Sequence, residues 1–453
     1  MSMLKAMRQM SLWERVEEEP GETRQESTSA EANNPRHETK DTGTALLLAV
    51  LARENLQKAW KRVKANKGAA GVDGLSIEQT AQQLRTSWPE IRERLLRGSY
   101  RPSPVRRVSI PKPGGGQREL GIPTVTDRLI QQAMLQVLQP ILDPTFSRHS
   151  YGFRPGRSAQ EAVKAAQAYV KSGRRYVVDV DLEKFFDRVN HDILIGRLRR
   201  RIADAGILRL VRAYLNSGIM RNGVVVAAEE GTPQGGPLSP LLANVMLDEV
   251  DKELERRGHT FARYADDCNV YVRSLKAGER VKRLLERCYG KLKLKLNRAK
   301  SAVAHVEGRK FLGFSFWFHK GEVKSKVADK ALATFKRRVR QLTPRRNGRS
   351  MEQTAAELRL YLVGWRAYFK LAQTPWVWKG LEGWVRRRLR AIQLKHWKSK
   401  KTIFDRLRAL GAYPSVARRI ASNTGRWWMN STGYINRVLD NAYFDKLGVP
   451  RLS

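Results

Sequence analysis

The sequence predicts an α+β fold followed by an all-helical region. Between residues 100 and 320, short apolar or alternating runs typical of strands are mixed with stretches of helical period. After about residue 328 the pattern is nearly all helical. The chain is also strongly basic, with 86 Lys and Arg against 44 Asp and Glu and a formal net charge of +42. A field of this sign favours a nucleic acid partner.

Composition narrows the class of protein further. The 11 Trp and 13 Tyr are interleaved with the basic residues and can stack on bases, which favours nucleic acid binding over a merely basic surface. No apolar run approaches the roughly 20 residues of a membrane span, and no signal peptide opens the chain. Cys268 and Cys288 cannot form a disulfide framework or a cysteine-rich zinc site. We therefore expect a cytoplasmic protein with no membrane partner.

The first hundred residues predict an arm and then helices. Residues 1–44 are polar and acid-rich, and too poor in apolar residues to offset the entropy of ordering, so we expect a flexible arm. Residues 45–66 have a helical period, and a second helix should begin after Ser76, a suitable N-cap. The first helix should present one apolar face, made of Leu48, Leu51, Leu56, Trp60 and Val63.

Strands appear from residue 101. Residues 101–125 alternate around a Pro-Gly-rich turn and predict a hairpin. Residues 174–189, RRYVVDVDLEKFFDRV, contain a short apolar strand that ends in carboxylates, and residues 261–272, FARYADDCNVYV, predict a second hairpin. The helical candidates after residue 328 are ADKALATFKRRVRQL, SMEQTAAELRLYLVGWRAYFKLA and PWVWKGLEGWVRRRLRAIQLKHWKSKK.

Three acids are candidates for catalysis. Asp266 and Asp267 stand together at the tip of the predicted hairpin, and Asp181 ends the strand YVVDVD. Carboxylates held rigidly at one end of a sheet suit phosphoryl transfer with divalent metal ions. Each feature also has a purely structural interpretation, because Asp-Asp favours a turn and Asp181 could cap the following helix. The loop PQGGPLSP, residues 233–240, lies between the two acidic elements, and its glycines permit close approach to a ligand.

The order and spacing of these motifs resemble a known family. YADD, with DLEKFFD before it and TPQGGPLSP between, resembles the palm of a reverse transcriptase. VRRVSIPKPGGGQRELGIPTVTDRLIQQAM and RHSYGFRPGRSAQEAV are similar to the fingers of group II intron-encoded reverse transcriptase/maturases. LRLYLVGWRAYFKLA with WVRRRLRAIQLKHWK resembles their maturase domain, also called the X or thumb domain. The resemblance covers roughly residues 45–453.

The resemblance implies a domain order and a reaction. The implied order is a flexible arm (1–44), a helical N-terminal extension (45–100), fingers and palm with an antiparallel sheet (101–325), an all-α thumb/maturase domain (326–410) and a basic end of the maturase region (411–453). The implied activity is RNA-directed DNA polymerisation with two Mg²⁺ ions, from dNTPs, on an RNA template with a DNA primer. The family pattern places the metal ligands, which are also the catalytic residues, at Asp181, Asp266 and Asp267.

The same pattern implies residues that contact nucleotide and primer. Phe186 should be the steric gate that excludes a ribose 2′-OH, with Phe185 as the alternative and core packing as the structural interpretation of both. Lys112, Arg118, Gln234 and Lys300 should lie near the incoming nucleotide, and surface salt bridging is the structural alternative for the first two. The turn Phe311, Leu312 and Gly313 resembles a primer grip, and a simple core strand is the alternative.

The basic helix at residues 384–401 has eight Lys or Arg and no acid, and it predicts an RNA-binding surface. The residues expected to bind RNA are Arg386, Arg387, Arg388, Arg390, Lys395 and Lys398. A solvated face with two buried tryptophans is the structural alternative. The expected partners are group II intron RNA, which the protein would help to splice, and target DNA.

Two other functional classes remain. One is a splicing factor that only binds RNA, which the intact YADD box disfavours. The other is a related reverse transcriptase recruited by a host for defence or DNA repair. Many relatives continue into a metal-dependent endonuclease, but no CxxC pair or His cluster supplies such a site here, so we expect no second-strand cleavage by this chain.

Overall fold

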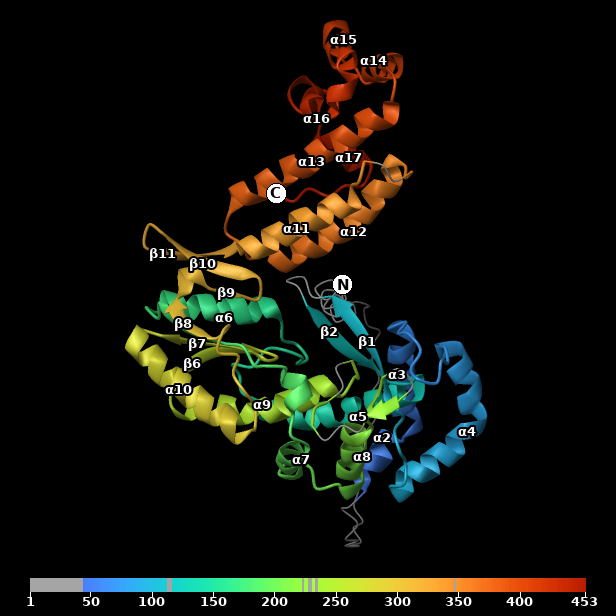
Figure 1. Cartoon of the computed structure of the whole chain (residues 1–453), viewed down its shortest axis with the longest axis vertical. Coiled ribbons are helices and arrows are strands. Elements are labelled where there is room, and N and C mark those ends of the chain that lie inside the picture. Colours follow the sequence, from blue (N-terminus) through green and yellow to red (C-terminus); the bar gives the residue numbers. More distant parts are fainter. Residues whose placement is uncertain (1–43, 112–115, 222–223, 227–229, 233–234, 346–347) are drawn as a thin grey trace, which may run out of the picture. The chain divides into compact units, whose positions relative to one another are not determined.

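The computed structural model describes residues 44–111, 116–221, 224–226, 230–232, 235–345 and 348–453. The chain divides between Val306 and Glu307 into two compact units. The first unit mixes helices with two four-stranded sheets, and the second joins a small sheet to a set of helices (Figure 1). This α+β architecture is the fold class that the sequence predicts.

The first unit opens with three helices, α2 (Ala45–Val50), α3 (Arg53–Ala65) and α4 (Ile77–Arg97). Ser76 caps α4 in a capping box with Gln79, as its place in the sequence predicts. The single helix expected over residues 45–66 is wrong, because the chain leaves the helical conformation at Ala52. The break turns α2 away from the face that α3 presents, so Leu48 is 50% exposed instead of sharing an apolar stripe.

The fingers-like sheet has the strand order β2-β1-β4-β5. Its strands are β1 (Val105–Pro111), β2 (Gln117–Ile122), β4 (Ile219–Arg221) and β5 (Val224–Val226). β1 and β2 pair antiparallel, as the Pro-Gly-rich turn between them predicts, and β1 pairs parallel with β4.

The second sheet, in the order β6-β7-β3-β8, carries the acidic motifs. Its strands are β3 (Tyr176–Val180), β6 (Thr260–Tyr264), β7 (Asp267–Val272) and β8 (Ala302–His305), all antiparallel to their neighbours. The remaining helices of the unit are α5 (Val125–Leu142), α6 (Ala159–Lys171), α7 (His191–Arg199), α8 (Ala205–Asn216), α9 (Ser239–Arg256) and α10 (Leu275–Lys291). One large apolar core joins the sheet to α5, α7, α8, α9 and α10, with Val178, Val270 and Leu285 fully buried in it.

The second unit begins with the sheet β11-β10-β9, made of β9 (Lys310–Phe311), β10 (Phe314–His319) and β11 (Glu322–Val327). Its helices are α11 (Asp329–Leu342), α12 (Met351–Phe369), α13 (Pro375–Trp397), α14 (Lys400–Ala409), α15 (Pro414–Ser422), α16 (Trp427–Asn430) and α17 (Asn441–Lys446). Aromatic rings hold α11, α12 and α13 together, with Trp365 4.4 Å from Phe335 and 5.3 Å from Trp378 between ring centroids. Within the described ranges, no helix has the length and apolar character of a membrane span.

Candidate polymerase active site

The β6–β7 hairpin holds two of the three acids. Its ladder closes with the pair Tyr264–Asp267, so Ala265 and Asp266 form a two-residue turn. Ala265 has a φ of 58°, a conformation that L residues adopt infrequently. Asp266 therefore sits in the turn itself, while Asp267 is the first residue of β7.

The neighbouring strand brings the third acid to the same place. β3 pairs with β7 in a register that ends at Val180–Cys268, and one further step places Asp181 opposite Asp267. Opposite residues of an antiparallel pair have Cα atoms about 4.5–5.5 Å apart and point to the same face. The structure thus brings together the acids that are far apart in the sequence, at one end of this sheet.

The backbone around Asp181 is held from its other side. Its N–H donates to the Ser301 hydroxyl at 3.1 Å, and its carbonyl accepts from the Asn297 N–H at 2.8 Å. Lys300, on the same segment, places its ammonium 3.7 Å from the Asp181 carboxylate, with both side chains partly exposed. Lys300 therefore lies beside the acidic site, in an exposed ion pair with Asp181.

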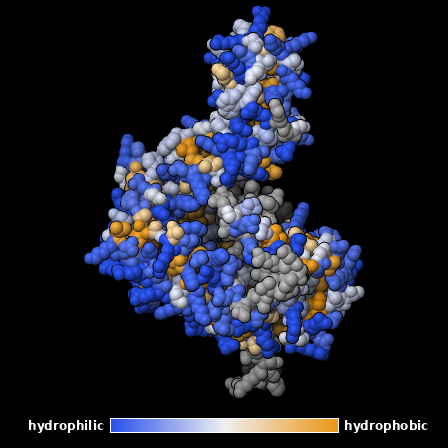
Figure 2. Space-filling view, viewed as in Figure 1, coloured by the Kyte–Doolittle hydropathy of each residue, from blue (hydrophilic) through white to orange (hydrophobic). Residues whose placement is uncertain are grey.

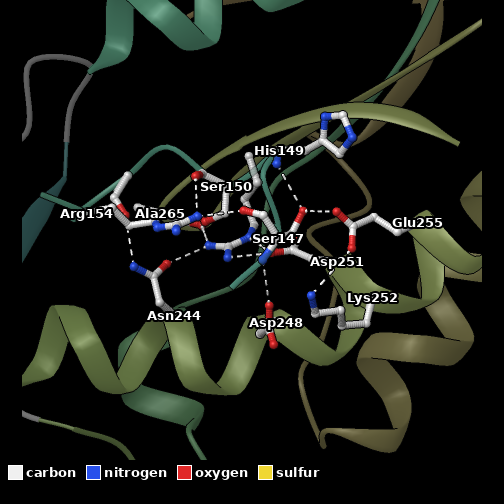
Figure 3. A network of polar contacts seen from close by, with 12 residues as sticks. Ser147, His149, Ser150, Arg154, Asn244, Asp248, Asp251, Lys252, Glu255 and Ala265 are labelled. Carbon is white, nitrogen blue, oxygen red and sulfur yellow. Dashed lines mark hydrogen bonds and ion pairs between the residues drawn. The ribbon is translucent and has the colours of Figure 1, made fainter. Parts of the chain in front are cut away.

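A buried polar network links the turn to α9 (Figure 3). Arg263 is 0% exposed and donates to the Ala265 carbonyl at 2.9 Å and to both carboxylate oxygens of Asp251, on α9. Desolvation tends to lower the pKa of Arg263, but the Asp251 carboxylate outweighs it and the pKa is raised. The guanidinium stays charged and fixes the turn to α9. Asn244 extends this network by accepting from Arg263 and donating to the Gly152 carbonyl, each at 2.9 Å.

Gly152, in the segment SYGFRPG, lies directly against the turn. A Cβ built on Gly152 would come within 2.2 Å of the Ala265 nitrogen and 2.9 Å of the Tyr264 carbonyl carbon. Only a residue without a side chain fits there. The sequence motifs indicate no role for Gly152 or Arg263. The available signal was a charged residue, Arg263, between the apolar residues of the stretch FARYA.

The two phenylalanines differ in environment. Phe185 is 2% exposed and belongs to the core, whereas Phe186 is half-buried, and their rings meet edge to face at 5.0 Å. The Phe186 carbonyl accepts from the Thr232 N–H at 2.7 Å, which brings the start of the glycine-rich loop beside this residue. Of the two gate candidates, Phe186 is therefore the one with an accessible surface.

Other predicted nucleotide contacts are only partly described. Lys112 and Gln234 lie outside the described residues. The backbone of Arg118 lies on β2 with its Cα opposite that of Ile110, but the structure does not describe its side chain.

The predicted primer grip lies in the second unit. Leu312 and Gly313 form the tight turn between β9 and β10, with φ angles of 51° and 82°. Tyr368 of α12 donates to the Leu312 carbonyl at 3.0 Å, and the Gly313 carbonyl accepts from Ala328 at 2.9 Å. The turn is consequently a rigid feature of this unit.

The donor chemistry of the acidic site fits a divalent cation. Within the described ranges, no three acidic, His or Cys side chains converge closely enough to hold an ion by themselves. Mg²⁺, however, typically takes one or two protein carboxylates and completes its shell with substrate phosphates and water. Asp181 and Asp267, facing each other across adjacent strands, supply that number.

Comparison with known proteins agrees with this geometry. The family description "Reverse transcriptase (RNA-dependent DNA polymerase)" matches residues 110–316, and "Group II intron, maturase-specific domain" matches residues 332–411. Protein YkfC of Escherichia coli (strain K12) is 36% identical over 312 residues, which cover 59% of this chain and 81% of YkfC. The chain belongs to the group II intron-encoded reverse transcriptase/maturase family.

Other relatives of this reverse transcriptase/maturase are longer. The group II intron-encoded protein LtrA of Lactococcus lactis subsp. cremoris is 36% identical over 229 residues, 49% of this chain but 37% of LtrA. The putative COX1/OXI3 intron 1 protein of Saccharomyces cerevisiae is 33% identical over 211 residues, 46% of this chain and 25% of that protein. The family, the fold class and the reverse transcriptase/maturase function predicted from the sequence are confirmed. The reverse transcriptase domain implies RNA-templated DNA synthesis from a primer and dependence on a divalent metal ion.

Two of the arginines that the sequence predicted to bind RNA are buried in the structure. Arg386 is 1% exposed and bonds Asp445 at 2.6 Å, and Arg390 is 7% exposed and donates to the Leu439 carbonyl at 2.7 Å. The assignment of these two arginines to RNA contact is wrong, because both are buried and bonded inside the second unit. Their spacing of four residues puts them on the inner face of α13, which the count of basic residues did not distinguish from the outer face.

The other four predicted RNA-binding residues retain accessible surface. Arg387 lies over the Trp428 ring at 4.2 Å, and Arg388 donates to the Thr343 carbonyl at 2.7 Å, so both are half-buried. Lys395 is also half-buried, and Lys398, just beyond the end of α13, is exposed. These residues remain candidates for RNA contact.

Proposed function

We propose that this reverse transcriptase/maturase extends a DNA primer on an RNA template with two Mg²⁺ ions held by Asp181, Asp266 and Asp267. The observation that carries the proposal is the juxtaposition of Asp181 and Asp267 across adjacent strands, next to a braced turn that holds Asp266. In the reaction, the primer 3′-hydroxyl gives up its proton to solvent and its oxygen bonds to the α-phosphorus of a dNTP. The bond between that phosphorus and the oxygen bridging to the β-phosphate breaks, and pyrophosphate leaves. The ions would lower the pKa of the attacking hydroxyl and neutralise the leaving phosphates.

The residues of the chain position the reactants. The carboxylates need a fixed geometry, which the β3–β7 ladder and the Arg263 bonds to Ala265 and Asp251 support. The exposed ammonium of Lys300 can exchange its Asp181 contact for a nucleotide phosphate. Phe186, the more accessible aromatic, would exclude ribonucleotides. Lys112, Arg118 and Gln234 are proposed to contact the nucleotide, as their motifs imply.

The maturase role is proposed to act on the RNA of a group II intron, with target DNA as a further partner. The match of residues 332–411 to the maturase-specific domain supports this assignment. The exposed Lys398 and the half-buried Lys395, Arg387 and Arg388 are the proposed contacts on this part of the chain. The turn Phe311 to Gly313 is proposed as the primer grip.

The double variant Asp266→Ala/Asp267→Ala tests the active site. It should abolish extension of a DNA primer on an RNA template in Mg²⁺, while binding of a structured RNA is retained because the RNA contacts lie elsewhere. A matched control, Glu54→Ala/Glu279→Ala, removes two exposed acids remote from the hairpin turn and should extend normally. Measurable extension by the aspartate variant would remove both residues from the chemistry. Loss of RNA binding as well would point to misfolding.

A further inference from the structure

An arginine-lined hollow lies on the first unit, at the end of the β6–β7 hairpin opposite to the acidic turn. Its volume is about 1110 Å³, and its walls come from α10, from the strand ends at Thr260 and Val272, and from Arg174. The walls carry six arginines and a single acid, Glu286. The arginines are Arg174, Arg257, Arg273, Arg280, Arg283 and Arg287. The hollow is separated from the turn by the length of β7, roughly 17 Å at 3.4 Å per residue.

The positive charge of this hollow is largely uncompensated. Arg257 pairs with Glu253 at 2.6 Å, but Arg273, Arg280, Arg283 and Arg287 are exposed and form none of the ion pairs found in the described part of the chain. Four like charges around one depression repel one another, and this repulsion lowers the stability of the folded protein when no ligand is bound. An anionic ligand would relieve that repulsion.

The floor beneath the arginines is rigid. Val281 and Leu284 of α10 are 3% and 6% exposed and pack into the large core, and Tyr271 is 2% exposed. Arg280, Arg283 and Arg287 follow at helical spacing, so they rise from one side of α10. Their Cα atoms extend over about 10 Å along the helix, which is longer than one phosphate group.

We infer that this hollow binds the phosphodiester backbone of an RNA helix, as a docking surface separate from the polymerase site. A small nucleotide would need convergent polar groups in a largely apolar pocket, whereas the hollow offers spread cations around an apolar floor. Cations spread along a helix fit the shape and backbone recognition of double-stranded RNA. The protein belongs to a family that acts on RNA, so folded RNA is the polyanion that it meets. This inference goes beyond the proposed polymerase chemistry and does not depend on it.

The test uses the full-length protein and a blunt RNA hairpin with a 3′-phosphate, which cannot serve as a primer. The quadruple variant Arg273→Gln/Arg280→Gln/Arg283→Gln/Arg287→Gln removes the four unpaired charges. The control Arg85→Gln/Arg92→Gln/Arg199→Gln/Arg200→Gln removes four exposed arginines from α4 and from the end of α7. Both variants have the same net charge, so a difference between them reports the site and not the overall field.

The readout is the slope of log K against log salt concentration. Each phosphate contact contributes roughly 0.7–0.9 to this slope, so four lost contacts should lower it by about 3, with at least a ten-fold loss of affinity near 0.1 M salt. Four Lys in place of the same arginines should preserve most of the slope. Equal slopes for the quadruple variant and its control would overturn the inference, as would competition by polyglutamate as effective as by RNA. A DNA hairpin of the same sequence that competes equally would overturn the assignment to RNA.

Primer extension on a separate short RNA template keeps this test apart from the polymerase proposal. The quadruple variant should extend normally, because the hollow lies at the far end of the hairpin from Asp266. Normal extension also shows that the variant is folded. If the wild-type protein fails to extend a primer while the quadruple variant still shows the reduced slope, the RNA docking proposal stands and only the polymerase proposal is refuted.

Discussion

Gly152 packs against the turn that holds Asp266, and replacing it with alanine should slow nucleotide addition by about 100-fold. The added Cβ would meet the Ala265 nitrogen at 2.2 Å and the Tyr264 carbonyl carbon at 2.9 Å, and both are backbone atoms that cannot rotate away. Ordinary contacts between heavy atoms lie near 3.5 Å, so the turn must move by about 1 Å to accept the methyl group. A misplacement of that size costs on the order of 100-fold in rate when it separates catalytic groups.

The assay is steady-state extension of oligo(dT) on poly(rA) in Mg²⁺, with kcat and the KM for dTTP measured separately. We expect kcat to fall while the KM changes little, because the turn holds Asp266 and not the nucleotide base. The control is Gly196→Ala on α7, where nothing lies within 4 Å of the new Cβ, and it should be active. A Gly152→Ala enzyme with kcat within a factor of about two of the wild type would refute the argument that the turn position limits the reaction.

Two further outcomes follow from the structure. Phe186→Ala should raise the incorporation of rNTPs relative to dNTPs, and an unchanged rNTP/dNTP ratio would place the gate elsewhere. Phe185→Ala should chiefly destabilise the fold, by about 3–5 kcal/mol, because Phe185 is 2% exposed in the core. Burial raises the pKa of Asp127 above its ordinary value of 3.8, so the folded state binds the proton more tightly than the unfolded chain does. Stability should therefore decline as the pH rises from about 3.9 through the folded-state pKa, and Asp127→Asn should flatten this decline in a series of Tm measurements. Identical Tm profiles for the wild type and Asp127→Asn would contradict this sign.

Local patterns in the sequence predicted the elements of the site well. The alternation around YADD predicted the hairpin, and YVVDVD predicted the strand that ends before Asp181. Ser76 was recognisable as a cap because capping depends on residues three positions apart. These features are encoded within a few residues, so periodicity and turn chemistry suffice to find them. The helix expected over residues 45–66 was wrong at Ala52, because a break in a helix is decided by how its two halves pack.

The sequence by itself determined the family and the three acids that we propose for the chemistry, in a chain of net charge +42. The tertiary structure decided which residues support them. Arg263 and Gly152 act on the turn through contacts that no spacing in the sequence encodes, and Arg386 and Arg390 face inward on a helix whose composition suggests a solvated surface. Burial and close approach arise from the packing of distant segments against one another. For that reason, composition showed that cations were plentiful but could not show which of them are free to bind RNA.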